Sequence, residues 1–355
     1  MTPDKAAQLQ TYLDAIAEIL YQESDPAAMQ TLEGIELTVR EKIQAHVSPA
    51  LGLFFIRAVS GTEAGRERTL KSTLGTLKVT TQQAKQLGVE SHRQLSPHLE
   101  NCCLRLSANV SYEQAANDLC YLTGVRVAAK TQQRLVQRQS FASPATEDKL
   151  KEVSVDGGKV RLRTALGEPC AWKDYKAVTG DGAVMASYRD NKALVEWVNQ
   201  HQLATPLTAL GDGHDGIWNI IAQIGVEDSR REILDWYHLV ENLHKVGGSL
   251  KRLNQAQALL WQGDIDAALA LFDGLQKPSA KNFCRYLRKH RHRIINYDYY
   301  QREQICSIGS GAIESAIKQI GRRVKISGAQ WNKENVPQVL AHRCAYLNGL
   351  IGSQS

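Results

Sequence analysis

The period of the apolar residues changes repeatedly between residues 150 and 250, and this change most constrains the fold of the chain. Alternating or short apolar runs predict a meander of strands at 152–155, 160–164, 172–178 and 183–188. Further along, strands at 207–210 and 232–236 alternate with helices at 191–202, 217–224 and 238–250. A meander followed by alternating strands and helices is typical of an α/β fold with a mixed sheet.

Three acidic residues lie where a predicted strand ends or where a glycine-rich loop opens a helix. They are Asp156 in Val153-Ser-Val-Asp156, Asp212 in Leu210-Gly-Asp212, and Glu314 in Gly309-Ser-Gly-Ala-Ile-Glu314. Carboxylate oxygens that meet at one edge of a sheet are the ligands that Mg²⁺ prefers. Two such ions can hold the attacking and leaving oxygens of a phosphoryl transfer. The alternative for the two aspartates is ordinary Asp-Gly turn chemistry.

Asp235 and His238 form a further polar pair at a predicted strand-to-helix junction. Asp235 could cap the helix that follows, or the pair could act beside the acids, with His238 as an orienting donor or a DNA contact. Asp215 stands directly before Gly216 and is predicted to cap the next helix.

Residues 111–138 have the outline of a helix-turn-helix. Ser111 and Gln114 fit a capping box, and Gly124 ends the first helix. The second helix, at about 128–138, places Lys130, Arg134 and Arg138 on one face. A helix, a glycine turn and a basic helix predict DNA contact, and two bundle helices with a solvated basic face are the alternative.

A second basic segment, residues 281–293, contains no acid. Its cations are Lys281, Arg285, Arg288, Lys289, Arg291 and Arg293. Phosphate neutralisation is the direct use of such a segment, and a solvated basic face is the alternative. Downstream of Glu314 we expect further phosphate contacts from Lys318, Arg322, Arg323 and Lys325. Trp331 is expected either to stack on a base or to fill the core.

Composition narrows the class of protein. With 43% hydrophobic and 23% charged residues, the chain is not a disordered protein. Its seven cysteines include no C-x-x-C pair, so structural zinc and a disulfide framework are not expected. The formal net charge is +6. No apolar run is long enough to span a bilayer and no export signal is visible, so a cytoplasmic protein with no membrane partner is expected. The first 60 residues predict helices whose apolar face is core, formed by Leu9, Tyr12, Leu13, Ile16 and Leu20.

Several of these segments, taken in order, resemble the DDE transposases of bacterial insertion sequences, most closely the ISKra-type group. They are VSVDGG at 153–158, LGDGHDGIW at 210–218, LDWYH at 234–238 and IGSGAIES at 308–315. The run from Arg323 to Trp331 resembles that family's Arg-x-Lys-x-x-Gly-x-x-Trp signature. The resemblance covers about residues 105–350.

The resemblance implies a ribonuclease H-like core with Asp156 on its first strand and Asp212 on its fourth. Asp156, Asp212 and Glu314 would be the catalytic residues and the ligands of Mg²⁺ or Mn²⁺, with two ions expected. Asp235 and His238 resemble the D-x-x-H signature of related transposases. Family members often carry cysteine pairs before the helix-turn-helix; residues 82–96 have none, a departure that leaves a zinc ribbon unexpected.

The implied activity is metal-dependent cleavage and strand transfer at the ends of an insertion sequence. The partners would be double-stranded DNA and a second protomer, in a homodimer bound at the bacterial nucleoid. Two alternatives stay open. One is another ribonuclease H-like DNA nuclease, such as a junction resolvase. The other is a decayed or co-opted transposase that only binds DNA.

The expected organisation has five parts. A mostly helical N-terminal region, 1–104, precedes the helix-turn-helix-like segment, 105–145. The first part of the ribonuclease H-like core, 146–249, is followed by a helical insertion, 250–304. The last part, 305–355, completes the core with the Glu-bearing helix and a C-terminal tail.

Overall fold

The computed structural model describes residues 1–146 and 148–352, which form two compact units, Met1–Leu135 and Val136–Ser355. The N-terminal unit begins with helices α1 (Pro3–Gln22), α2 (Leu32–Lys42) and α3 (Ser48–Ser60). A hairpin of β1 (Glu67–Ser72) and β2 (Gly75–Thr80) follows, in which the cross-strand partners Leu70 and Leu77 are buried. The unit continues with α4 (Thr81–Gln86), α5 (Pro97–Ser107), α6 (Tyr112–Thr123) and most of α7 (Ala129–Arg138).

The apolar face of α1 differs from the sequence prediction. We expected a core face, yet Leu9, Tyr12, Leu13 and Ile16 expose 37–58% of their surface, and Leu20 is half-buried. The helical period is present, so the helix itself was predicted correctly. Its apolar stripe is exposed because it borders a groove between α1 and α2 that no described part of this unit fills.

The turn between α6 and α7 follows the prediction in most respects. Ser111 caps α6 by accepting the amide of Gln114 at 3.1 Å, and Gly124 ends the helix with a φ of 73°. The other half of the predicted capping box is not formed. The side-chain amide of Gln114 instead donates to the Asp118 carboxylate at 2.6 Å, because this carboxylate lies one turn ahead on the same face of the helix.

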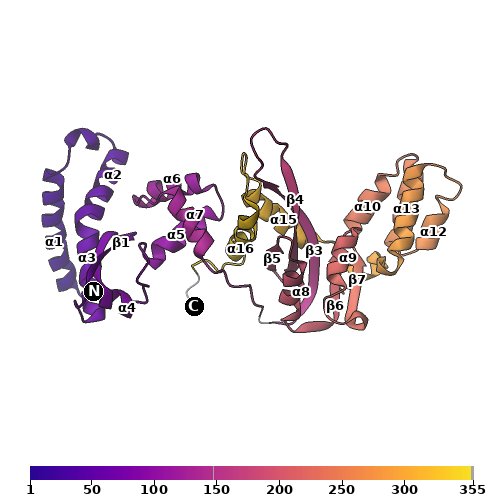
Figure 1. Cartoon of the computed structure of the whole chain (residues 1–355), viewed down its shortest axis with the longest axis horizontal. Coiled ribbons are helices and arrows are strands. Elements are labelled where there is room, and N and C mark those ends of the chain that lie inside the picture. The colour runs from indigo at the N-terminus through magenta and orange to yellow at the C-terminus, as the bar shows by residue number, and fades with distance from the viewer. Residues whose placement is uncertain (147, 353–355) are drawn as a thin grey trace. The chain divides into compact units, whose positions relative to one another are not determined.

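The C-terminal unit contains a mixed five-stranded sheet in the order β5-β4-β3-β6-β7 (Figure 1). The strands are β3 (Leu150–Leu162), β4 (Ala171–Gly180), β5 (Ala183–Ser187), β6 (Leu203–Gly211) and β7 (Arg230–Leu234). The first three form an antiparallel meander, while β6 and β7 run parallel to β3. The α/β class with a mixed sheet is therefore confirmed.

One strand replaces two that were predicted. We expected a strand ending at Asp156 and another from residue 160, whereas β3 runs through both and pairs Asp156 with Ala177. The pair Gly157-Gly158 reads as a turn in the sequence, yet it continues the strand. At Gly158 a Cβ atom would lie 2.3 Å from the Tyr175 ring, so glycine here makes room for that ring. Asp156 therefore projects from the middle of the central strand.

Helices cover both faces of the sheet. Val153 and Val155 point into the core formed with α8 (Asn191–Asn199) and α9 (Asp215–Ile221). Val160 and Leu162 point into the opposite core, formed with α15 (Gly311–Val324) and α16 (Val336–Leu347). Because side chains alternate along a strand, Asp156 lies on the α15 face.

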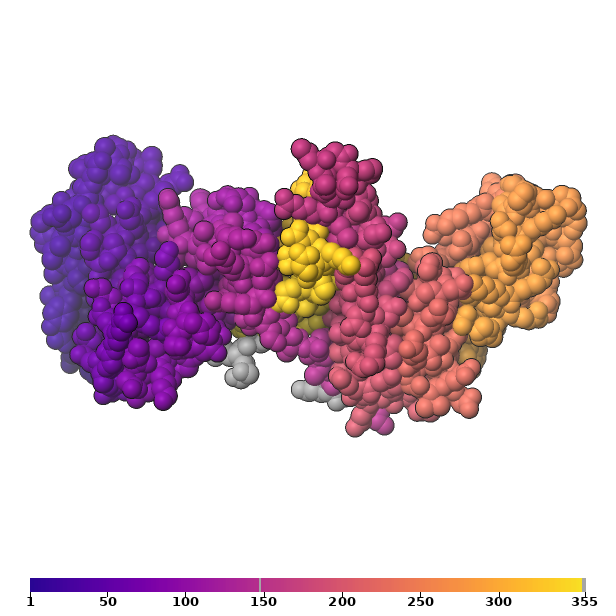
Figure 2. All heavy atoms as spheres, in the orientation of Figure 1, coloured from indigo at the N-terminus to yellow at the C-terminus, as the bar shows by residue number. Residues whose placement is uncertain are grey.

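Between β7 and α15 the chain is helical. The helices are α10 (Trp236–His244), α11 (Leu250–Trp261), α12 (Ile265–Ala270), α13 (Pro278–Lys289) and α14 (Tyr297–Arg302). Figure 2 shows residues 250–290 as the orange end of this unit. They share one core with the sheet: the buried Tyr297 donates its hydroxyl hydrogen to the Leu234 carbonyl oxygen at 2.8 Å. Within the described ranges, no helix is both long and apolar enough to cross a membrane.

Candidate metal centre

Asp235 ties together the elements that carry the candidate site. Its backbone amide donates to the Gly211 carbonyl at the end of β6, at 2.9 Å. Its carboxylate is fully buried and caps α10 by accepting the amide of His238 at 2.7 Å. The other carboxylate oxygen accepts the amide of Ser310, directly before α15. Asp235 therefore does cap a helix, as one interpretation predicted, and it also holds the start of the Glu314 helix against β7.

Asp235, His238 and Glu314 form a group that could bind a metal ion. One ligand atom from each residue lies within 4.8 Å of the others, and the described residues contain no other such group. The Asp235 oxygen and His238 Nδ1 are 3.2 Å apart. Asp235 and His238 were predicted as auxiliary residues beside the acids, and the structure brings them directly to Glu314.

His238 is surrounded by carboxylates. The hydrogen bond to Asp235 contributes most to raising its pKa to about 9, burial opposes the shift, and the charges of Asp212 and Glu314 add to it. The imidazole is therefore protonated at neutral pH. Its positive charge lies among acids that come from β6, β7 and α15.

Asp156 shares this electrostatic environment. Burial is the main cause of its raised pKa, and the nearby charge of Asp212 raises it further. The amide of Gly157, which donates at 2.6 Å, and the charges of His238 and Lys176 oppose the shift. A buried carboxylate with a second carboxylate near it is a place where a cation is stabilising.

The predicted triad of Asp156, Asp212 and Glu314 is thus brought into one region, but not into one tight group of ligand atoms. Asp212 accepts the amide of His214 at 2.8 Å, as Asp156 does that of Gly157. Glu314 pairs with Lys318 at 3.3 Å, on the helix surface. Local donors therefore engage each of the three carboxylates.

The predicted cap at Asp215 is wrong. His214 occupies the cap position of α9, and its ring nitrogen accepts the Gly216 amide at 3.0 Å. Asp215 forms an ion pair with Lys289 instead. Because that lysine is 74 residues away, no pattern of neighbouring residues predicts the pairing.

Several arginines and lysines predicted to bind DNA are already paired within the chain. Lys289 pairs with Asp215, and Arg291 pairs with Asp266. Arg293 contacts Glu232 at 2.7 Å and lies 3.8 Å from the centre of the Trp218 ring. Its side chain is mostly buried and paired, so the predicted DNA contact by Arg293 is wrong.

Arg285 and Arg288 lie exposed on α13, and Lys281 with them. The exposure of these three side chains agrees with a basic surface on α13, and DNA contact by them stays a prediction. The other cations of the segment, Lys289, Arg291 and Arg293, are neutralised by acids from other elements. These acids are Asp215, Asp266 and Glu232.

Trp331 and Arg323 belong to the core. The Trp331 indole donates to the Val324 carbonyl at 3.0 Å, and its backbone pairs with the end of β3. The Arg323 guanidinium is buried 4.9 Å from the centre of that indole ring. The core alternative for Trp331 is therefore correct, and phosphate contact by Arg323 is excluded by its burial. Lys318, Arg322 and Lys325 are exposed.

On α7, Lys130, Arg134 and Arg138 are exposed, while Leu135 and Val136 are buried. The predicted basic face is therefore present at the surface. This placement fits both DNA contact and a solvated helix face, and DNA contact stays a prediction.

Sequence reasoning missed two residues of the site. Ser310 donates its amide to Asp235, and Lys176 carries a charge that acts on Asp156. Ser310 was noted only as part of the glycine loop. No sequence pattern indicates Lys176, because it comes near Asp156 only through the pairing of β3 with β4, in which Lys176 lies opposite Gly157.

A search of known protein families gives no match to this chain, and no curated protein matches it either.

Proposed function

We propose that the chain is a DDE-type DNA transposase with a ribonuclease H-like core. The observation that carries the proposal is the convergence of acids from three distant segments around His238. Asp156 comes from β3, Asp212 follows β6, and Glu314 lies on α15. The order β5-β4-β3-β6-β7 is compatible with this fold, and the motif resemblance supplies the particular family.

The cluster around His238 offers oxygen ligands that suit a divalent cation, although Asp156, Asp212 and Glu314 do not form one tight group of ligand atoms. Burial, and after it the charge of Asp212, raise the pKa of Asp156, and a cation bound beside this carboxylate would offset both effects. Mg²⁺ or Mn²⁺ would be held by Asp156, Asp212 and Glu314, with Asp235 and His238 beside them. When bound, the ions would supply Lewis-acid stabilisation of the phosphate under attack.

The residues of the chain would orient the reactants. In the first step, the oxygen of water bonds to phosphorus, the bond to the 3′ oxygen breaks, and that oxygen takes a proton. In the second step, the freed 3′ hydroxyl attacks a phosphate of target DNA, and the target's own 3′ oxygen leaves. Asp235 would position His238 and the Glu314 helix, and neither step needs a covalent bond to a side chain.

The test is a strand-transfer assay in Mg²⁺ with the DNA that flanks the gene as donor. The variant Asp156→Asn removes the central carboxylate charge with little change of shape, and we expect activity to fall by about 10²–10³-fold or more. Asp174→Asn is the matched control, because this carboxylate is exposed on the neighbouring strand β4. Undiminished activity of Asp156→Asn would refute the assignment.

The same assay separates the alternatives. Cleavage of the ends without joining would indicate a nuclease of the same fold. Binding of the ends in Ca²⁺, with no cleavage in Mg²⁺, would indicate a protein that only recognises DNA.

A further inference from the structure

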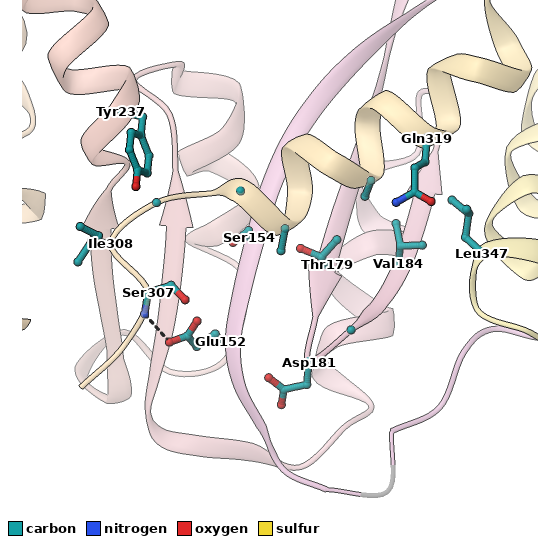
Figure 3. Close-up of a pocket in the computed structure, with 15 residues that line it drawn as sticks. Glu152, Ser154, Thr179, Asp181, Val184, Tyr237, Ser307, Ile308, Gln319 and Leu347 are labelled. Carbon is teal, nitrogen blue, oxygen red and sulfur yellow. Dashed lines mark hydrogen bonds between the residues drawn. The ribbon is translucent and has the colours of Figure 1, made fainter. Parts of the chain in front are cut away.

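A cavity of 660 Å³ opens on the α15 face of the sheet (Figure 3). It is lined by β3, β4, the loop before α15, the start of α15 and Tyr237. Asp156, Asp212 and Glu314 are not among the described residues that line it. We call it the strand-face cavity.

Two hydroxyl groups on the floor of the strand-face cavity lack hydrogen-bond partners. Ser154 and Thr179 are cross-strand neighbours on β3 and β4, and they expose only 6% and 8% of their surface. Neither hydroxyl has a hydrogen-bond partner among the residues that the structure describes. Neither hydroxyl oxygen is among the fully enclosed polar atoms of the described residues, so both face the open cavity, where they can donate to a ligand or accept from it.

The start of α15 adds hydrogen-bond donors. Ser310 gives α15 no side-chain cap, and its own amide is taken by Asp235. The next residues, Gly311 and Ala312, line the cavity. Amides of the first helical turn have no partner within the helix, so they can donate to a ligand with acceptor groups.

Acceptors lie at the other end of the cavity. Glu152 accepts the Ser307 amide at 2.7 Å, and Asp181 accepts the Lys151 amide at 3.0 Å, so each carboxylate has a further oxygen for a ligand. These two negative charges disfavour a bare phosphate. Val184 and Leu347 supply apolar wall, and Tyr237 supplies an aromatic ring. A flat ligand with both donor and acceptor groups on its edge, as a nucleobase has, matches this lining.

We propose that the strand-face cavity binds a single unpaired nucleobase of the DNA strand that passes the acid cluster. The proposal rests on the proposed function. Ser154 lies two residues before Asp156 on the same face of β3, about 7 Å along the strand. A base adjacent to a phosphate at the acids therefore lies within reach of the cavity.

The test measures binding of dAMP, dCMP, dGMP, dTMP and inorganic phosphate to the full chain without divalent metal, by equilibrium dialysis. We expect at least one nucleotide to bind more tightly than phosphate. Ser154→Ala with Thr179→Val should weaken it at least tenfold. Thr164→Val, beyond the end of β3 and outside the cavity lining, is the control and should leave binding unchanged.

Phosphate that binds as tightly as every nucleotide, or an unchanged affinity in the double variant, would overturn the nucleobase site. If the double variant does not fold, Gln319→Ala at the cavity wall on α15 must give the same weakening. The two proposals fail separately. Nucleotide binding without DNA cleavage would refute only the transposase function. Cleavage without nucleotide binding would refute only the nucleobase site in the strand-face cavity.

A second, independent observation concerns the first three helices, α1, α2 and α3, which we call the helical hairpin. No residue of α1 or α2 is buried. Fifteen large apolar side chains between Leu9 and Val59 expose 37–73% of their surface. A groove of 750 Å³ runs between α1 and α2, lined by apolar side chains that include Leu13, Ile16 and Val39. A helical hairpin of this kind needs a partner to bury its apolar face.

The net charge argues against DNA as the partner, and the exposed apolar area argues for a protein. Residues 1–47 contain eight acids and three Lys or Arg, a net charge of −5, which disfavours DNA on this surface. The four aromatic side chains, at roughly 150–250 Å² each and 58–68% exposed, offer about 400–650 Å², and the eleven aliphatic side chains add to this area. A stable protein interface needs about 800 Å² from each partner. We infer that the hairpin pairs with the same hairpin of a second copy, because each copy offers both the groove and the protruding side chains that fill it.

The mass of the full chain in solution, measured by light scattering at low and high salt, tests this pairing. We expect a dimer at both, and a tighter one at high salt, because salt screens the repulsion between two surfaces that each carry a net charge of −5. Leu13→Glu with Ile16→Glu should raise the dissociation constant at least 100-fold. Leu166→Glu, on the exposed connection between β3 and β4, should leave the dimer intact.

A monomeric wild type at micromolar concentration, or a double variant that stays dimeric, would overturn the pairing. Both substituted positions are exposed, so the fold of each copy should survive, and circular dichroism checks this. If that double variant unfolds, Phe54→Glu on α3 must give the same dissociation.

Discussion

The carboxylate of Asp235 accepts the backbone amide of Ser310, a residue 75 positions further along the chain. This hydrogen bond joins the end of β7 to the start of the Glu314 helix across the whole helical insertion. The Trp236 amide supports the same junction by donating to the Ile308 carbonyl at 3.0 Å. The position of Glu314 relative to the sheet therefore depends on Asp235, which belongs with Glu314 to the group that could bind a metal ion.

Substitution Asp235→Asn should destabilise the fold. An asparagine has one acceptor oxygen for the amides of Ser310 and His238, and it removes the charge beside His238. We expect the free energy of unfolding to fall by about 3–5 kcal/mol, measured by urea denaturation. Asp228→Asn, at an exposed position of the short 3₁₀ helix Glu227–Ser229, should change it by less than about 0.5 kcal/mol. A similar small change at both positions would contradict the role of Asp235.

The ion pair of His238 should make stability depend on pH. The folded-state pKa of His238 is raised from 6.5 to about 9, chiefly by Asp235. The stabilisation is therefore fully present below pH 6.5 and is lost as the pH rises through about 9. In chelator, the difference in unfolding free energy between wild type and His238→Gln should shrink from pH 6.5 to 9. A difference that stays constant over this window would rule out a raised pKa.

Removing the Glu232 charge should leave two buried guanidinium groups without a counter-ion. Glu232 contacts Arg230 at 2.9 Å and Arg293 at 2.7 Å, and these arginine side chains are 4% and 16% exposed. We expect Glu232→Gln to cost about 3–5 kcal/mol of stability. Glu196→Gln breaks the exposed pair with Lys192 and should cost less than about 1 kcal/mol. Equal losses in chemical denaturation would show that burial does not strengthen the Glu232 cluster.

The same ion pairs explain where sequence reasoning failed. The segment 281–293 has no acid of its own, so it was interpreted as a surface for phosphate. Its neutralising acids, Asp215, Glu232 and Asp266, come from other elements. Such pairs form only through tertiary packing, so no pattern of neighbouring residues predicts them.

Local patterns did predict the framework. The changes of period gave the mixed sheet, and Gly124 gave the end of α6, because these signals are carried by neighbouring residues. The glycine pair after Asp156 misled because it serves packing of Tyr175 across the strand, and not a turn. Likewise the helical period of α1 was correct, but periodicity does not say what covers the apolar face.

That packing role of glycine gives a last prediction. A Cβ atom at Gly158 would lie 2.3 Å from the buried Tyr175 ring, so Gly158→Ala must displace the ring and should cost about 1–3 kcal/mol. Gly321→Ala, inside α15 with open space around it, should instead stabilise by about 0.5–1 kcal/mol, because glycine is a poor helix former. Melting temperatures should therefore move in opposite directions. Adding Tyr175→Leu to Gly158→Ala should cost less than the sum of the two single changes, since the clash is then absent. Additive losses would show that the two residues do not constrain each other.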